Sequence, residues 1–398
     1  YVNEGSPFVM FKVSGVPTAG ITLTLTDGSA QASSDYTNAL QYWNGSTWET
    51  YSAGSPPALD ANGALLVRVP VLQDQTNEPD ENLQLSVRYT GAVNGAQTNL
   101  VPDTTRIFSG NAWIVDDGNG NVYPDLPPAN GDAQQATPYD PATTPVIPAT
   151  PTQPITDDDR ALSVNDITVN EKSPYAVFTV SGFEGQYVQL ALSAGASNPA
   201  TAGSDYTDAL EYWNGSAWTS YTTGTYVKVP ADADATAGEA AKLLVRVAIT
   251  DDTTPDNGET LKLTATNTGG ASDEGICTIA DDGSGKYFPN LSPVTPSNPN
   301  SPLAPQELTP ASDPVVGPTI DPTHPLPDDE RTLSVNNITV NEKSPYAVFT
   351  VTGGAGQYVK MSLADGAATR DAGGTVLDDG SEDFGPALQY YNGTSWQT

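Results

Sequence analysis

The sequence predicts an all-β protein of tandem antiparallel β-sandwiches joined by extended, proline-rich linkers. Three observations support this fold class. The same short segments return in one order along the 398 residues, apolar and polar residues alternate within these segments, and prolines gather between the repeats. An alternation with a period of two is typical of strands that bury one face, as in sandwiches of about seven strands.

The repeat is recognised by VNEKSPYAVFTV, which occurs at 169–180 and 340–351, and by the related VNEGSPFVMFKV at 2–13. Four further landmarks follow in a constant order, which indicates one domain used repeatedly. They are SDYTNALQYWNGSTW (34–48), SDYTDALEYWNGSAW (204–218) and EDFGPALQYYNGTSW (382–396); LLVRV (65–69 and 243–247); DENLQLSV (80–87) and GETLKLTA (258–265); and IVDDGNG (114–120) and IADDGSG (279–285).

These landmarks define the expected domain boundaries. We expect a sandwich at 1–123 with its first strand cut short, a linker at 124–160, a sandwich at 161–288, a linker at 289–331 and the N-terminal half of a third sandwich at 332–398. Because the chain opens and stops in mid-pattern, we expect it to be a window on a longer protein. No run of about 18 apolar residues is present, so no membrane insertion is expected in this window.

The two linkers are rich in proline: residues 124–157 hold 9 prolines and residues 289–327 hold 12. Proline falls on every third residue over part of each linker, which lines one face of a polyproline II rod. The linkers are interpreted either as semi-rigid spacers or as rods that dock on a sandwich. In the second case Pro296, Pro299 and Pro302 are expected to meet the aromatic side chains of Trp213, Trp218 and Tyr221.

Composition excludes several functions. The formal net charge of −33 argues against nucleic acid or an anionic membrane surface as a partner, because both require basic patches. The single cysteine, Cys277, rules out an intrachain disulfide. The only histidine, His324, lies in a linker, which excludes Ser-His-Asp and Cys-His nucleophiles within this window. We therefore expect no enzyme activity.

Carboxylates stand near strand ends in four separate segments of each repeat. A sandwich gathers its loops at two ends, so these side chains could converge. Clustered carboxylates repel one another unless a cation is present, and calcium is the natural choice because it takes six to eight oxygen ligands.

The segments DGSA…SDY (27–36), VLQDQTNEPDENLQL (71–85) and IVDDG (114–118), with VAITDDTTPDNGETL in the second repeat, resemble the Calx-beta domain. This immunoglobulin-like sandwich is known from sodium–calcium exchangers and bacterial repeat adhesins. The resemblance implies Ca²⁺ as the cofactor and a glutamate near the first strand as one ligand. The implied ligands are Glu4, Asp35, Asp74, Glu78, Glu81, Asp116 and Asp117 in the first repeat; Glu171, Asp205, Asp251, Asp252, Asp256, Glu259, Asp281 and Asp282 in the second; and Glu342 and Asp383 in the third.

An aromatic hairpin follows the SDY segment in each repeat. Asn-Gly between aromatic arms predicts a two-residue type I′ turn at Asn44 and Gly45, which would make Trp43 and Trp48 diagonal neighbours on one face. These pairs are interpreted either as packing that stabilises the hairpin or as a platform for glycans or a neighbouring domain. The pairs are Trp43 with Trp48, Trp213 with Trp218, and Tyr391 with Trp396.

Together these features predict an extracellular, secreted structural or adhesive protein, part of a bacterial surface adhesin or biofilm matrix filament stiffened by calcium. Its expected partners are neighbouring repeats or other copies of itself. Two alternatives remain open: a carbohydrate-binding array that uses the tryptophan hairpins, and an accessory region of a secreted enzyme.

Overall fold

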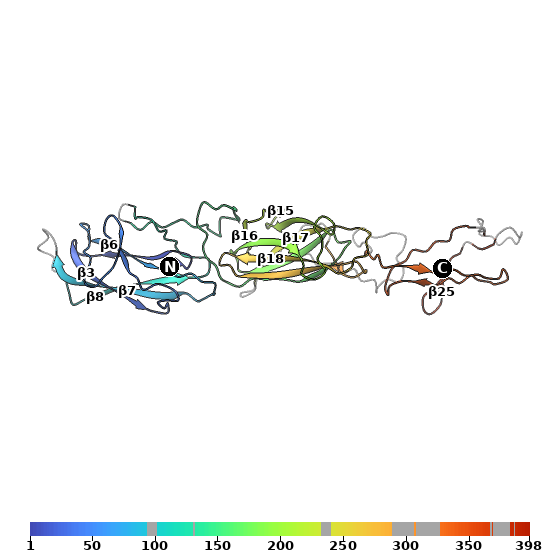
Figure 1. Cartoon of the computed structure of the whole chain (residues 1–398), viewed down its shortest axis with the longest axis horizontal. Coiled ribbons are helices and arrows are strands. Elements are labelled where there is room, and N and C mark those ends of the chain that lie inside the picture. Colours follow the sequence, from blue (N-terminus) through green and yellow to red (C-terminus); the bar gives the residue numbers. More distant parts are fainter. Residues whose placement is uncertain are drawn as a thin grey trace.

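The computed structural model describes residues 1–93, 102–129, 132–231, 240–288, 306–307, 327–366, 368, 383–385 and 387–398. These residues form an all-β protein in which repeat 1 (1–123), repeat 2 (161–288) and the partial repeat 3 (332–398) follow one another along the long axis (Figure 1). Within these ranges no helix is long and apolar enough to cross a membrane.

Repeat 1 is a sandwich of two four-stranded sheets, with the orders β1-β8-β7-β3 and β2-β6-β4-β5. Inward side chains of both sheets, such as Val9, Leu23 and Val67, form one buried core, as the alternation in the sequence predicts. The strands are β1 Val2–Asn3, β2 Phe8–Ser14, β3 Ala19–Asp27, β4 Gln41–Trp43, β5 Trp48–Thr50, β6 Ala64–Pro70, β7 Glu81–Val93 and β8 Ile107–Val115.

Repeat 2 has the same plan with two larger sheets, β10-β12-β17-β14-β15 and β21-β20-β11-β19-β18-β13-β16-β9. Its core includes Phe178, Leu190 and the free thiol of Cys277, which is fully buried. The strands are β10 Ser163–Val164, β11 Ile167–Asn170, β12 Tyr175–Gly182, β13 Tyr187–Ala194, β14 Tyr206–Trp213, β15 Trp218–Ser220, β16 Tyr226–Lys228, β17 Ala241–Ile249, β18 Glu259–Asn267, β19 Ser272–Ala280 and β20 Lys286–Tyr287.

The first segment of repeat 2 is divided between the two sheets. β10 pairs antiparallel with β12, and β11 then pairs parallel with β19. This division places the end of β11 beside the end of β19, because parallel neighbours finish at the same edge of a sheet.

Linker 1 is attached to both repeats. Its strand β9, Val146–Ile147, pairs with β16 at the edge of repeat 2, and the Ile147 side chain is fully buried there. Burial of such a side chain stabilises the contact by roughly 1.5–3 kcal/mol. On repeat 1, the carboxylate of Asp125 forms an ion pair with Arg68 at 2.7 Å. The first linker is therefore an added edge strand as well as a connection.

The second linker is described only at 306–307 and 327–331. Its strand β21, Gln306–Glu307, pairs with β20. The predicted contacts of Pro296, Pro299 and Pro302 lie outside the described residues.

Repeat 3 contains two short ladders within its described residues. β22, Ser334–Val335, pairs with β23, Val351–Thr352, and β24, Tyr390–Tyr391, pairs with β25, Trp396–Gln397. The side chain of Val335 is 60% exposed.

The predicted type I′ turn of the aromatic hairpin is wrong. Trp43 pairs directly with Trp48, so the loop has four residues and the rings are opposite rather than diagonal neighbours. The Asn44 side chain decides this geometry, because its Oδ1 accepts hydrogen bonds from the N–H groups of Ser46 and Thr47, both at 2.8 Å. An asparagine side chain that bonds to the following backbone favours this wider turn.

Candidate metal centres

Four clusters of carboxylates are present in the described residues, two at the end of repeat 1 and two at the end of repeat 2, and two of the four include residues of the following linker. Within each cluster, one oxygen from every member lies within 4.8 Å of one oxygen from each of the others. We name them junction cluster 1 (Glu4, Asp116, Asp157, Asp159), junction cluster 2 (Glu171, Asp281, Asp328, Glu330), rim cluster 1 (Asp35, Glu78, Glu81) and rim cluster 2 (Asp205, Asp256, Glu259).

Strand pairing explains the position of the glutamate that follows each VN segment. β1 runs parallel to β8, and the Glu4 N–H donates a hydrogen bond to the Val115 carbonyl at 2.9 Å. Glu4 therefore leaves the sheet beside Asp116, the residue that follows β8. The same pairing of β11 with β19 brings Glu171 to Asp281 in repeat 2.

The remaining members of each junction cluster come from the segment that leads into the next repeat. Asn3 holds this segment in place: its Oδ1 accepts a hydrogen bond from Asp157 N–H at 2.8 Å, and its Nδ2 donates to the Asp157 carbonyl at 3.0 Å. Asn170 binds the backbone of Asp328 in the same way, at 2.9 and 3.2 Å. The invariant position of this asparagine in the two repeats thus has a structural cause.

Residues 157–160, the leading segment of repeat 2, direct their side chains alternately to repeat 1 and to repeat 2. Asp157 and Asp159 enter junction cluster 1. Asp158, between them, accepts hydrogen bonds from Arg160 Nε at 2.9 Å and from a terminal guanidinium nitrogen at 2.6 Å. Gln186 of repeat 2 donates to the Arg160 carbonyl at 2.6 Å. Successive side chains of an extended chain point in opposite directions. Asp157 and Asp159 therefore point to one side and Asp158 to the other, and the three consecutive aspartates connect the two repeats.

The second junction repeats this arrangement. Asp328 and Glu330 enter junction cluster 2, while Asp329 accepts hydrogen bonds from Arg331 at 2.8 and 2.6 Å. Gln357 of repeat 3 donates to the Arg331 carbonyl at 2.6 Å.

Several carboxyl groups of the junction clusters resist ionisation in the absence of a cation. Burial, followed by the neighbouring charge of Asp116, raises the pKa of Glu4 to about 8. Burial first and adjacent carboxylates next raise the pKa of Asp159 to about 7. In junction cluster 2, burial and acidic neighbours raise the pKa of Glu171 to about 7 and of Glu330 to about 9. The raised pKa values reflect first the cost of burying a negative charge and then the repulsion between neighbouring carboxylates.

Some buried oxygens of these clusters lack any partner within the described part of the chain. Asp159 is 3% exposed, and neither of its carboxylate oxygens has a hydrogen-bond partner; the same holds for Oε2 of Glu171, which is 4% exposed. Buried carboxylate oxygens without donors are costly. A bound cation would satisfy them, so the residues present fit a metal ion.

The rim clusters are more open and lie next to the junction clusters. The Glu78 N–H donates to Asp116 Oδ2 at 3.0 Å while the Glu78 side chain enters rim cluster 1. Burial, then a hydrogen bond to Asp35, raises the pKa of Glu81 to about 7. In repeat 2, burial and a hydrogen bond to Asp205 raise the pKa of Glu259 to about 7.

Several of the expected ligands lie outside the four clusters. Asp117 and Asp282 instead accept hydrogen bonds from the backbone of their own turns, at Asn119 and Ser284. Glu342 and Asp383 of repeat 3 are exposed. The carboxylates of Asp74 and Asp252 accept hydrogen bonds from the N–H groups of Thr76 and Thr254. The N–H groups of the same two aspartates donate to the side chains of Glu4 and Glu171. Asp251 forms an ion pair with Lys172.

Four cluster members were not predicted from the sequence: Asp157, Asp159, Asp328 and Glu330. A signal for them exists, because DDDRALSVND at 157–166 and DDERTLSVNN at 328–337 are near-copies with the same spacing as the VNE segments that follow. In the sequence these acids fall at the ends of the two linkers, where charged residues are ordinarily solvated.

The aromatic pairs pack within the sandwiches of repeats 1 and 2. The Trp43 and Trp48 rings meet edge to face at 5.5 Å, and the Arg68 guanidinium lies 4.3 Å from the Trp48 ring and 3.7 Å from the Phe8 ring. In repeat 2, Arg246 lies between Tyr175 and Trp218 at 3.8 and 4.3 Å. These contacts support packing and cation–π stabilisation of the hairpin.

No protein-family model matches the chain, and no curated protein matches it. Similar solved structures include the Pseudomonas aeruginosa CupB2 chaperone, with a TM-score of 0.19 and 8% identity over 70% of this chain and 96% of that chain. Mouse clustered PcdhgC3 EC1-3 has a TM-score of 0.25 and 12% sequence identity, over 70% of this chain and 64% of that chain. The Pseudomonas aeruginosa CupB6 tip adhesin has a TM-score of 0.20 and 11% sequence identity, over 70% of this chain and 92% of that chain.

Scores this low carry no argument about function. The predicted fold class of tandem antiparallel β-sandwiches is confirmed by the strands of the chain itself.

Proposed function

We propose that this chain is part of an extracellular structural or adhesive repeat protein, a bacterial surface adhesin or matrix filament, in which calcium bound at the junction clusters stiffens the connection between successive repeats. One observation carries the proposal: the buried cluster of repeat 1 is completed by Asp157 and Asp159 from the leading segment of repeat 2.

The chemistry of the donors favours calcium. All four groups of each junction cluster are carboxylates, which together offer up to eight oxygens, and calcium takes six to eight. Histidine and thiolate, which zinc and copper favour, are absent from the clusters. Magnesium keeps several of its waters and is bound through one or two carboxylates, so a buried set of four suits it less well.

A cation at this position would act on the geometry of the rod. Without it, four carboxylates from two repeats repel one another or hold protons, and the leading segment is attached mainly through Asn3 and neighbouring backbone hydrogen bonds. With it, Glu4 and Asp116 of repeat 1 and Asp157 and Asp159 of the leading segment share one ion. Arg160 and Gln186 then pass this restraint on to repeat 2.

The first experiment compares Asp159→Asn with the matched control Asp117→Asn in the full chain. Calcium binding is measured by calorimetry, and the maximum dimension by small-angle X-ray scattering with and without calcium. We expect Asp159→Asn to weaken one site by at least about tenfold, since even partners outside the ligand shell matter by about 10–100-fold, and to abolish calcium-dependent stiffening between repeats 1 and 2.

Asp117→Asn should leave both measurements unchanged, because the Asp117 carboxylate caps its own turn and lies outside the cluster. Equal affinities for the two variants, or a scattering profile that is independent of calcium in the unmodified chain, would contradict the proposal.

A further inference from the structure

Linker 1 leaves repeat 1 and returns to the point from which it started. The Gly118 N–H donates a hydrogen bond to the Asp157 carbonyl at 2.9 Å. Next to this bond, Asp117 and Asp158 are partners in an antiparallel bridge. Residues 118–157 therefore form a loop whose two ends lie side by side, and we call it the closed loop.

The base of the closed loop is the junction between the repeats. Nδ2 of Asn3 in repeat 1 donates hydrogen bonds to the carbonyls of Asn119 and Asp157, at 2.9 and 3.0 Å, so it binds both ends of the loop. Junction cluster 1 joins the same two sides. The repeats follow one another along the long axis (Figure 1), so tension between them passes across this junction and bypasses the closed loop.

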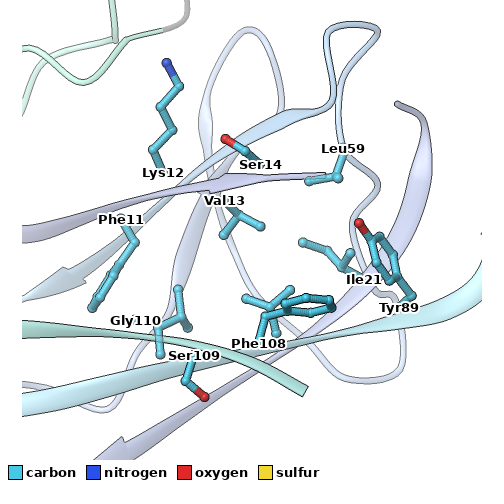
Figure 2. A pocket seen from close by; sticks show the side chains of 12 residues that line it. Phe11, Lys12, Val13, Ser14, Ile21, Leu59, Tyr89, Phe108, Ser109 and Gly110 are labelled. Atoms are coloured by element: carbon cyan, nitrogen blue, oxygen red, sulfur yellow. The ribbon is translucent and has the colours of Figure 1, made fainter. Parts of the chain in front are cut away.

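On repeat 1, the closed loop is held by exposed polar contacts. Figure 2 shows Lys12 on the side of β2 opposite to Phe11 and Val13, and its ammonium forms an ion pair with Asp132 of the loop. The side chains of Lys12 and Asp132 are 51% and 72% exposed. Ion pairs this exposed contribute little, so this contact resists tension weakly once the junction is open.

On repeat 2, the closed loop is held more firmly. Its strand β9 pairs with β16, and the Ile147 side chain is fully buried. The Lys228 N–H donates a hydrogen bond to the Pro145 carbonyl at 3.1 Å. The Tyr187 hydroxyl donates to the Thr144 carbonyl at 2.8 Å. After the junction opens, β9 is thus the contact that must detach before the whole loop can extend.

We propose that linker 1 is a store of length, released under tension when junction 1 opens and taken up again when the tension falls. The inference rests on the proposed function, which supplies the tension. The closed loop has about 40 residues, which extend to at most about 130–145 Å at 3.3–3.6 Å per residue. A filament built in this way lengthens while its sandwiches stay folded.

The composition of the linker suits this role. Residues 124–157 hold 9 prolines, which have no backbone N–H and favour an extended chain. The released loop therefore has few backbone hydrogen bonds to form with itself. The entropic cost of closing a loop rises only slowly with its length, so a loop of this size can close again at the junction.

The test stretches the full chain between two points in an optical trap. Handles are attached through non-natural side chains at Ala61 and Thr253, which are both exposed. Ala61 precedes β6 at the end of repeat 1 that lies away from the junction. Thr253 follows β17 at the opposite end of repeat 2, beside junction cluster 2. Tension between these handles crosses junction 1 and does not load linker 2.

A disulfide at the base of the loop provides the matched control. The double variant Asp117→Cys with Asp158→Cys places two thiols opposite each other in the antiparallel bridge, close enough for a disulfide. Neither aspartate belongs to junction cluster 1. The native Cys277 is fully buried and does not compete. Oxidation locks the closed loop, and reduction of the same molecules frees it.

In calcium, the unmodified chain and the reduced variant should both show a reversible lengthening of about 130 Å as their event of lowest force. The oxidised variant should lack this event and keep the unfolding of the sandwiches at higher force. Ile147→Ala should lower the force at which the last part of the lengthening occurs. The proposal is overturned if the event of lowest force persists in the oxidised variant, or if a sandwich of the unmodified chain unfolds first.

A chelator separates this inference from the proposed function. An ion that binds only the closed junction stabilises it by mass action, so its removal should lower the force of the lengthening. A lengthening that the disulfide abolishes but the chelator does not shift supports the store of length and contradicts the assignment of calcium to junction cluster 1.

Discussion

In repeat 2 the side chains of Phe178 and Val180 are fully buried, whereas their counterparts in repeat 1, Phe11 and Val13, are partly exposed. The sequences at these positions are alike, so the residue types do not cause the difference. The difference lies in a neighbouring strand: β10, which precedes the VNE segment of repeat 2, covers β12, whereas the sequence begins at Tyr1, after the corresponding place in repeat 1. Burial of an apolar strand is thus decided by which other segment lies against it.

The two repeats also differ in how they neutralise the same buried arginine. Arg246 pairs with Glu211 on the neighbouring strand of its own sheet. At the position of Glu211, repeat 1 has Gln41, which accepts a hydrogen bond from Arg68, and the carboxylate comes from Asp125 in linker 1. The carboxylate that pairs with the arginine therefore belongs to the sandwich itself in repeat 2 and to linker 1 in repeat 1.

The largest expected effect concerns the junction clusters, which the two repeats share. Saturating calcium should raise the melting temperature of the full chain strongly at pH 8 and weakly at pH 5. An ion that binds only the folded state stabilises it by about 2.7 kcal/mol at 100 times its Kd. Thermal unfolding after exhaustive dialysis, with and without calcium added back, measures this effect.

The pH dependence follows from the raised pKa values. Glu4, Glu171 and Glu330 have ordinary values near 4.5 when unfolded and about 8, 7 and 9 in the folded, calcium-free protein. The folded state therefore favours their protonated forms, and the calcium-free protein loses stability as the pH rises from about 4.5 through these values. A calcium effect of equal size at both pH values would refute this origin.

An intermediate effect should separate the two glycines. Gly275→Ala should destabilise repeat 2 by about 1–3 kcal/mol, because its Cβ would overlap Asn165 and Val164. Gly110→Ala should leave repeat 1 unchanged or stabilise it by about 0.5–1 kcal/mol, since alanine restricts the unfolded chain more than glycine does. Denaturant unfolding of the two variants compares them directly. Equal destabilisation would mean that Gly110 also lies against a neighbouring segment.

The smallest effect concerns the counter-ion of the arginine. Asp125→Asn should cost about 0–1 kcal/mol, because the Asp125 side chain is 69% exposed and such pairs are weak. Glu211→Gln should cost more, since its side chain is 32% exposed and lies beside an arginine that is 7% exposed. Thermal unfolding of both variants gives the ranking. A larger loss for Asp125→Asn would show that the linker contact matters more to repeat 1 than the internal pair does to repeat 2.

Much of the candidate site was predictable from residues that flank strands. Glu4 and Asp116 follow strands that end at one edge, so ordered landmarks were enough to bring them together. Asp116 and Asp117 could not be told apart, because adjacent residues leave a strand in opposite directions and the sequence does not show which one turns inward. Asp157 and Asp159 were missed because their role requires two repeats to meet.

The sequence correctly predicted a hairpin at the aromatic pair, but the predicted turn type was wrong. Asn-Gly indicated a turn between Trp43 and Trp48, and a turn is present. The Asn44 side chain bonds to the backbone of Ser46 and Thr47, which widens the loop to four residues and places the two rings directly opposite each other.

By itself, the sequence determined the repeat, the class of fold and the acidic character of the strand ends, because these depend on periodicity and on the order of segments. The tertiary structure alone decided that Asp157 and Asp159 complete the cluster of the preceding repeat and that Gly275 lies against Val164 and Asn165. These outcomes depend on which segments, distant along the chain, come to lie against one another, and burial and electrostatic repulsion act only once they do.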